Sequence, residues 1–188
     1  MSTSTATAPA ATGLTTWAID PAHTHVEFAV RHLMITTVKG RFTDLSGAVR
    51  MHDDDITKSD VDIRIAAASI DTREPQRDAH LKSPDFFDVD TYPEITFRSR
   101  RVSDVDGNEF KLTGDLTIHG VTREVTLNVT SEGRAKDPWG GERAGFSATT
   151  RIKRGDFGLK WNQALETGGV VVGDDVKIAL EIELLKQA

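Results

Sequence analysis

The segment HVEFAVRH, residues 25–32, alternates apolar and polar side chains along most of its length. Neighbouring residues on a β-strand point to opposite faces of the sheet, so Val26, Phe28 and Val30 share one face. His32 falls on that same face, while His25, Glu27, Ala29 and Arg31 fall on the other. The pattern predicts an amphipathic strand that buries one face.

The same period of two returns through most of the chain. It is clearest in five further segments, near residues 61–67, 111–118, 125–129, 146–152 and 176–184. Less regular strands are expected near 17–20, 40–51 and 95–102. We therefore expect about eight or nine strands, each with one apolar face.

The loops that connect these segments are short and rich in turn-forming residues. Examples are Asp53-Asp54-Asp55, the run Asp104 to Asn108, and His119-Gly120. Short loops favour antiparallel neighbours, and long crossover helices of the kind that parallel sheets need are not evident. The chain is predicted to be an all-β protein, either a sandwich or a barrel, because alternation alone does not choose between them.

Composition narrows the class of protein further. The 188 residues fit one domain, and the lack of cysteine excludes disulfides and thiolate chemistry. A net charge of −6 argues against nucleic acid as a partner. No apolar run is long enough for a transmembrane helix.

The N-terminal residues differ from the rest of the chain. Residues 1–15 are rich in Ser, Thr and Ala and are expected to form a disordered tail, because they bury too little to offset the entropy cost of ordering. This stretch also lacks the features of a secretion signal, so a cytoplasmic location is expected. Residues 16–188 are then a single domain, and the sequence leaves a homodimer open.

One segment, residues 74–88, interrupts the strand pattern. Pro75 suits a first helical turn, and Pro84 ends the run of helix formers that follows. Phe86 and Phe87 are expected on a second short helical turn, where both rings can lean on one apolar surface. We expect them to cover one opening of the folded domain.

Several motifs in order resemble the YceI-like family. They are Trp17 to Leu33 (WAIDPAHTHVEFAVRHL), Gly40-Arg-Phe, Ser69-Ile-Asp-Thr, Arg77 to Asp88 (RDAHLKSPDFFD), Tyr92-Pro and Gly114 to Thr122 (GDLTIHGVT). The resemblance runs from Trp17 to the C-terminus. It implies an extended, eight-stranded, antiparallel, lipocalin-like β-barrel with a short helical segment. It also implies an apolar cavity that binds a polyisoprenoid, such as an isoprenoid quinone or a prenyl pyrophosphate, for storage or transport.

A slender apolar ligand is physically reasonable for such a barrel, although small barrels can also fill with their own side chains. A ligand of about forty carbon atoms has an affinity ceiling of roughly 12 kcal/mol, at about 0.3 kcal/mol per atom. The candidate ligand-binding residues are those of the apolar faces and the helical segment: Val26, Phe28, Val30, Phe42, Ile63, Ile65, Arg77, His80, Phe86, Phe87, Phe97, Leu116, Phe146 and Ile178.

Two polar groupings invite sharper hypotheses. His23, His25 and His32 differ in strand parity, so no metal site is expected from them, and no cofactor is predicted. On a helix, Arg77, His80 and Leu81 share one face, and Asp78 can pair with Lys82 within the helix. Arg77 and His80 could donate hydrogen bonds to a ligand head group. Alternatively, ordinary salt bridges could pin the helix to the rim, with Leu81 as the anchor.

Catalytic motifs are missing from the sequence. It has no nucleophile elbow, phosphate loop or zinc-protease helix. The protein is therefore predicted not to be an enzyme. The alternative, an enzyme acting on an isoprenoid-like lipid, would rest on an Asp78/His80 pair.

Overall fold

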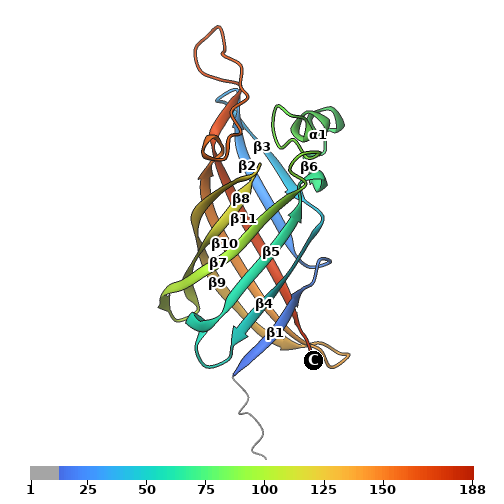
Figure 1. The fold of residues 1–188 in the computed structure, drawn as a ribbon, viewed down its shortest axis with the longest axis vertical. Helices are drawn as coiled ribbons and strands as arrows, with labels where there is room; N and C mark the ends of the chain where they lie inside the picture. The colour runs from blue at the N-terminus through green and yellow to red at the C-terminus, as the bar shows by residue number, and fades with distance from the viewer. Residues whose placement is uncertain (1–12) are drawn as a thin grey trace, which may run out of the picture.

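The structure, a computed structural model, describes residues 13–188 as a tall barrel of long, tilted strands (Figure 1). The strands are β1 (Leu14–Ile19), β2 (His25–His32), β3 (Thr36–Phe42), β4 (Leu45–His52), β5 (Asp60–Ala66), β6 (Ile70–Asp71), β7 (Glu94–Asp106), β8 (Glu109–Ile118), β9 (Val121–Lys136), β10 (Glu142–Lys153) and β11 (Val172–Lys186). The α-helix α1 spans Pro75–Lys82, and short 3-10 turns cover Ile56–Lys58, Ala67–Ser69 and Arg154–Phe157.

The sheet closes on itself. Hydrogen bonds join the strands in the order β1-β4-β5-β7-β8-β9-β10-β11, and β11 also pairs with β1. That ring has eight strands, and every pairing in it is antiparallel. The predicted eight-stranded antiparallel barrel is confirmed, and the sandwich alternative is excluded.

Strand β11 pairs with two different strands along one of its edges. β11 pairs with β1 near its C-terminal end, as in Trp17 opposite Lys186, and with β2 over the rest, as in Phe28 opposite Ile178. β2 in turn pairs with β3, and β3 pairs with β6. These three strands extend the wall toward the end of the barrel that carries α1 (Figure 1). The single strand expected near 40–51 is in fact the end of β3 and most of β4, because Thr43 and Asp44 break the ladder. Thr43 instead donates its N–H to Ser69.

The two ends of the barrel are packed differently. Away from α1, a dense cluster surrounds Trp17 and Leu184, which are 0% and 1% exposed. Arg134 and Lys186 lie over the Trp17 ring, at 5.2 and 5.8 Å from its centre, and close that end with cation–π contacts. At the α1 end, a second cluster centres on Ala67, Ile95, Ile118, Phe157 and Leu159.

The helical segment is shorter than expected. Glu74 caps α1 by accepting from the N–H groups of Gln76 and Arg77, Pro75 occupies its first turn, and the helix ends at Lys82. Residues 83–87 form hydrogen-bonded turns, in which the Phe86 N–H donates to the Ser83 carbonyl. The second helical turn expected at Phe86 and Phe87 is therefore not a helix.

The expected tail falls mainly on residues 1–12, which lie outside the described residues. Its predicted end at residue 15 is too late, because Leu14 and Thr15 already belong to β1 and pair with His52 and Met51. Within residues 13–188, no helix combines the length and the apolar character that crossing a membrane requires.

Candidate ligand cavity

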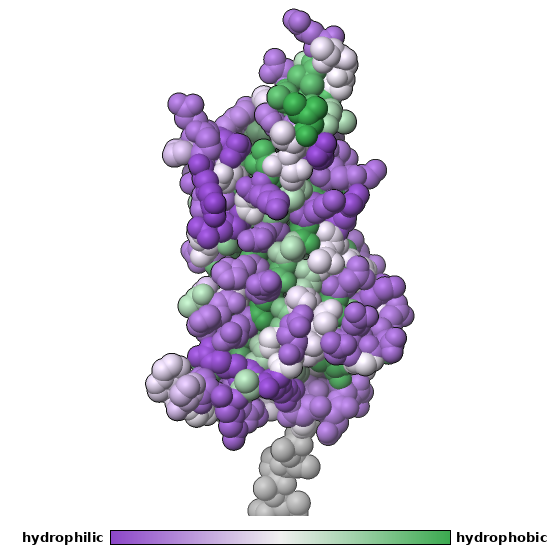
Figure 2. All heavy atoms as spheres, turned by 180° about the vertical axis from the view of Figure 1, so that it is seen from behind, coloured by the Kyte–Doolittle hydropathy of each residue, from purple (hydrophilic) through white to green (hydrophobic). Residues whose placement is uncertain are grey.

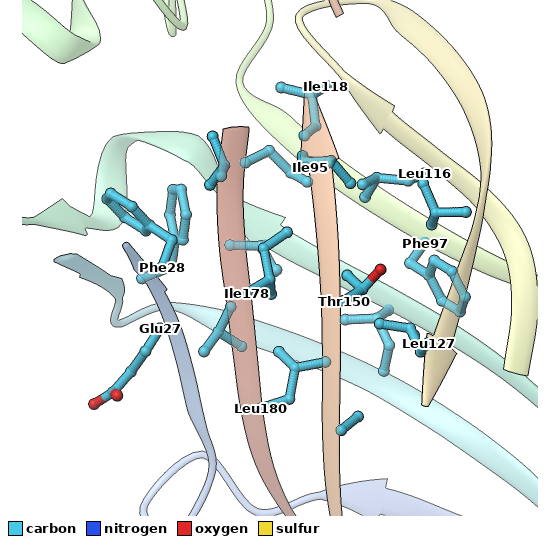
Figure 3. A pocket seen from close by; sticks show the side chains of 18 of the residues that line it. Glu27, Phe28, Ile95, Phe97, Leu116, Ile118, Leu127, Thr150, Ile178 and Leu180 are labelled. Carbon is cyan, nitrogen blue, oxygen red and sulfur yellow. The ribbon is translucent and has the colours of Figure 1, made fainter. Parts of the chain in front are cut away.

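A large apolar cavity fills the interior of the barrel. Its volume is about 460 Å³, within the range of typical ligand pockets. The apolar faces of the barrel strands form its wall, and Figure 3 shows the side chains of Ile95, Phe97, Leu116, Ile178 and Leu180 among those that line it. The interior is therefore hollow, and it is not packed shut by side chains.

The cavity is long as well as apolar. Along β11 it is lined by Val172 and by alternate residues from Val176 to Leu184. At about 3.3 Å per residue, the regular stretch from Val176 to Leu184 measures about 26 Å. Most of these wall residues, including Ile178 and Leu180, are only half-buried, because they face the hollow interior and not another side chain.

Every residue predicted to bind a ligand lines this cavity. The fourteen are Val26, Phe28, Val30, Phe42, Ile63, Ile65, Arg77, His80, Phe86, Phe87, Phe97, Leu116, Phe146 and Ile178. The strand residues arrive there because their parity turns each apolar face inward, and the remaining four come from α1 and the turns after it. Whether they contact a ligand stays a prediction.

Aromatic rings close the α1 end of the cavity. Phe86 is 7% exposed, and its ring centre lies 5.1 Å from that of His80 and 5.3 Å from that of Trp161. Phe87 packs edge-on against Phe42, at 5.9 Å between ring centres. Both phenylalanines therefore lie between the rim and the cavity, and neither ring projects into solvent.

Hydrogen bonds hold helix α1 to the end of the sheet. Arg77 donates from Nε to Thr72 Oγ1 at 2.7 Å and from Nη2 to the Thr72 carbonyl at 2.8 Å. Asp78 accepts from the N–H and the hydroxyl of Thr72. The helix is pinned as the second hypothesis expected, but by these hydrogen bonds to Thr72 and not by salt bridges. The pair expected within the helix, Asp78 with Lys82, is not among the ion pairs of residues 13–188.

The hypothetical catalytic pair does not form. Asp78 is bound to Thr72, whereas the His80 Nε2 atom lies 2.8 Å from Asp85 Oδ2. The two groups that the enzyme hypothesis would need therefore have different partners.

Sequence reasoning missed several residues of the cavity wall. Trp161 and Arg154 lie outside the alternating segments, in the stretch between β10 and β11, where no periodic pattern marks them. Arg154 and Trp161 come together at the cavity wall only in the folded chain, where the Arg154 guanidinium donates to the Trp161 carbonyl. Leu127, Leu180 and Ile182 also line the cavity and could have been found from strand parity alone.

The histidines do not assemble into a site. His25 is exposed on the outer face of β2, as its parity predicted, whereas His32 lines the cavity. His23 lies near Asp20 and Glu183, and the three have a spacing that could hold a metal ion. However, Arg143 Nη1 lies 2.6 Å from both Asp20 Oδ2 and Glu183 Oε1, so a guanidinium already neutralises these carboxylates.

These contacts shift the acid–base behaviour of the Asp20 cluster. Hydrogen bonds from His23 and then from Arg143 lower the pKa of Asp20 to about 2, and the carboxylate of Asp20 in turn raises the pKa of His23. The cluster ties the bend between β1 and β2 to β10 and β11. We assign it a structural role at the end of the barrel opposite α1.

Hydrophilic side chains cover most of the outer surface in the view of Figure 2, and hydrophobic ones gather near its upper end and show in a band down the middle of this face. Met34 and Ile35, in the turn between β2 and β3, are 55% and 73% exposed. The polar exterior and the apolar interior together define a class: a closed antiparallel β-barrel that encloses a long apolar cavity.

The chain belongs to the YceI-like domain family, whose match covers residues 17–184. It is 41% identical over 171 residues to a UPF0312 protein of Staphylococcus aureus strain MSSA476. The aligned region covers 90% of this chain and 97% of the relative. This family membership confirms the resemblance that the motifs indicated.

Solved structures have the same fold. Burkholderia cenocepacia BcnA matches with a TM-score of 0.76 and 26% identity, covering 88% of this chain and 98% of that one. The Campylobacter jejuni YCEI protein matches with a TM-score of 0.73 and 34% identity, over 84% and 90% of the two chains. A polyisoprenoid binding domain from Saccharophagus degradans matches with a TM-score of 0.64 over 91% and 98%, and at 16% identity this likeness shows the fold alone.

Proposed function

We propose that this protein binds a long-chain polyisoprenoid or a similar amphiphilic lipid inside the barrel, and that it stores or carries that lipid. The observation that carries the proposal is the cavity itself: about 460 Å³, lined by the apolar faces of the barrel strands. A slender apolar molecule would remove both its own surface and these half-exposed side chains from water.

Two further observations support a lipid as the ligand. The regular part of the wall on β11, from Val176 to Leu184, is about 26 Å long, which suits a chain better than a compact molecule. In addition, a structural neighbour with the same fold is described as a polyisoprenoid binding domain.

We also propose that the bound lipid is not chemically changed. The Asp78/His80 pair, on which a lipid-processing activity would rest, is divided between Thr72 and Asp85. The expected cytoplasmic location, the absence of nucleic acid as a partner, and the homodimer stay predictions.

Native mass spectrometry of protein purified gently from its own host, followed by organic extraction, tests the binding role. We expect one hydrophobic molecule per barrel that survives gentle desolvation and appears in the extract. A protein that carries no lipid and takes up none when incubated with polyprenols would contradict the proposal. Incubation of the complex tests the second part, because a change in the mass of the bound lipid would indicate turnover.

A further inference from the structure

The exposed apolar side chains of the barrel are spread unevenly. Of the five large hydrophobic side chains exposed within residues 13–188, Met34 and Ile35 are neighbours in the turn between β2 and β3. The other three come singly from β1, from β7 and from the loop between β9 and β10: Leu14, Val105 and Trp139. Single exposed hydrophobic residues are ordinary on protein surfaces, whereas adjacent ones form a candidate contact surface.

The turn that carries this pair is strained and firmly held. Leu33 has a φ of 52° and Met34 a φ of 63°, in the left-handed region that residues other than glycine rarely adopt. The Arg31 guanidinium donates to the Met34 carbonyl at 2.9 Å, and the Leu33 N–H donates to the Val171 carbonyl at 2.9 Å. Strain that the surrounding structure maintains is characteristic of functional segments, so this turn is a candidate for one.

A second loop supports the turn. In residues 158–171, which lie between the last 3-10 turn and β11, the Leu165 N–H donates to the Gly169 carbonyl at 3.1 Å. Gly169 lies against the turn, because a methyl group on it would be 3.3 Å from Met34 Cγ. In Figure 1 this orange-red loop reaches further along the long axis of the barrel than helix α1 does. We call residues 33–35 and 158–171 together the barrel tip.

The interior cavity extends to the base of the barrel tip. His32, Trp161 and Val171 all line it, and the Val171 carbonyl is the one that accepts from the turn. The opposite end of the barrel is filled by the cluster around Trp17 and Leu184. A lipid that enters along the axis of the barrel therefore does so at the tip end.

The sheet is also incomplete at the tip end. β3 pairs with β2 from Thr36 to Phe42, but β6 pairs with the other edge of β3 only at Arg41 and Phe42. In the part of the chain that the structure describes, that edge has no further strand partner between Thr36 and Gly40. Movement of a lipid past this edge would therefore break no strand pairing.

Charge turns the same end toward an anionic surface. Residues 31–39 and 158–171 carry three basic side chains, Arg31, Lys39 and Lys160, and a single acidic one, Glu166, although the whole chain has a net charge of −6. Charges further apart than about 8 Å are largely screened at physiological ionic strength, so the local balance decides which part of the molecule approaches such a surface.

The size of the apolar pair indicates what kind of surface it fits. A stable contact between two proteins buries about 800 Å² on each partner, and two side chains supply only a fraction of that area. A lipid bilayer, by contrast, accepts a narrow apolar projection, because the apolar groups enter the acyl boundary while basic side chains stay among the head groups. Figure 2 shows hydrophobic side chains gathered toward this end of the molecule.

We infer that the barrel tip docks on the surface of a lipid bilayer that contains anionic head groups. Met34 and Ile35 enter the acyl boundary, and Arg31, Lys39 and Lys160 lie among the head groups. This contact places the open end of the cavity next to the bilayer. Docking itself does not depend on the content of the cavity, whereas its use, the loading and unloading of the barrel, rests on the binding role proposed above.

Vesicle flotation of the full chain tests the docking. The probes are vesicles of equimolar phosphatidylcholine and phosphatidylglycerol, and vesicles of phosphatidylcholine alone. We expect the chain to float with the mixed vesicles and to bind the neutral ones about fivefold more weakly, because the basic side chains of the tip then lose their partners. A chain that floats with neither kind of vesicle would overturn the inference.

Variants then locate the contact. Met34→Ser combined with Ile35→Ser should weaken binding to the mixed vesicles by about tenfold or more, since both apolar side chains leave the bilayer. Trp139→Ser is the matched control, because it removes an even more exposed apolar side chain, one in the loop between β9 and β10. This control should bind vesicles as the original chain does. Equal binding by the double variant and the original chain would overturn the inference.

Two further measurements separate docking from other roles. Uptake of a polyprenol from detergent solution, without vesicles, should be the same in the double variant and in the original chain. Uptake without flotation would overturn docking while the binding role stands, and flotation without uptake would overturn the binding role while docking stands. Sedimentation analysis covers the other occupant: a dimer that the double variant abolishes, in a chain that does not float, would assign the tip to a second copy and overturn the inference.

Discussion

The ring of His80 lies edge-on to the ring of Trp161, with 4.8 Å between their centres. This contact joins helix α1 to the stretch of chain between β10 and β11, two segments far apart in the sequence. Phe86 completes the cluster by contacting both rings. The three rings form a clasp at the α1 end of the cavity, and we call them the aromatic clasp.

Trp161→Ala should loosen the aromatic clasp. Aromatic pairs contribute roughly 1 kcal/mol each, so we expect amide hydrogen exchange in residues 75–92 to become at least about fivefold faster, and bound lipid to leave sooner. Hydrogen exchange with mass spectrometry measures the first effect. Trp139→Ala is the control, because that side chain is 87% exposed. Equal exchange rates in the two variants would refute the role of the clasp.

Ala148→Trp should fill the cavity. Ala148 is buried on β10, lines the cavity and lies opposite Leu180 of β11 and Val129 of β9. A large ring there occupies the space of the lipid, so binding should weaken by about tenfold or more while the barrel stays folded. Thr149→Trp is the control, because Thr149 is the next residue and is exposed on the opposite face of the strand. This variant should bind the lipid as tightly as the original chain does. Undiminished binding by the Ala148 variant would argue against an interior site.

Gly114→Ala should destabilise the barrel. A methyl group at this position in β8 would lie 2.5 Å from the Arg98 carbonyl oxygen and 2.6 Å from the Phe97 ring. Since the backbone cannot move easily, we expect a loss of about 2 to 3 kcal/mol in the free energy of unfolding. At Gly145 the nearest atom would be 3.5 Å away, so Gly145→Ala should cost less than about 1 kcal/mol. Urea denaturation of the two variants compares them directly.

Asp20 should make stability depend on pH in acid. Its pKa is 3.8 ordinarily and about 2 in the folded chain, so the unfolded chain binds the proton more readily. The stabilisation is complete above about pH 4 and is lost as the pH falls from about 4 to about 2. Because the side chain is 16% exposed and partly screened, we expect about 1 to 2 kcal/mol from this group.

Asp20→Asn should therefore lower stability near neutral pH and flatten its dependence on pH between about 2 and 4. Denaturant unfolding at several pH values measures both effects. Asp90→Asn, in an exposed turn, is the control. If the free energy of unfolding of Asp20→Asn changed with pH as steeply as that of the original chain, the Asp20 cluster would not contribute to the pH dependence of stability.

Periodicity was enough to predict the strands and their inner faces. The alternation of Val26, Phe28 and Val30 repeats in β5, β8 and β11, and the side chains it turns inward do line the cavity. Strand ends were harder to predict. The break at Thr43 and Asp44 depends on Ser69, which accepts the Thr43 N–H from another part of the chain.

Polar groups were the least predictable from local sequence. Arg77 and His80 share a helix face, as expected, but their partners Thr72 and Asp85 became evident only in the fold. Arg154 carried no signal at all, because its role depends on carbonyls of four residues further along the chain.

By itself, the sequence determined an all-β chain of amphipathic strands, because side-chain direction alternates locally along every strand. The motifs added the family resemblance. Only the tertiary structure decided that the sheet closes between β1 and β11, that the interior stays hollow, and that Arg77 and Arg154, far apart in the sequence, line the same cavity. Closure and charge placement depend on contacts between residues far apart in the chain, which no local pattern encodes.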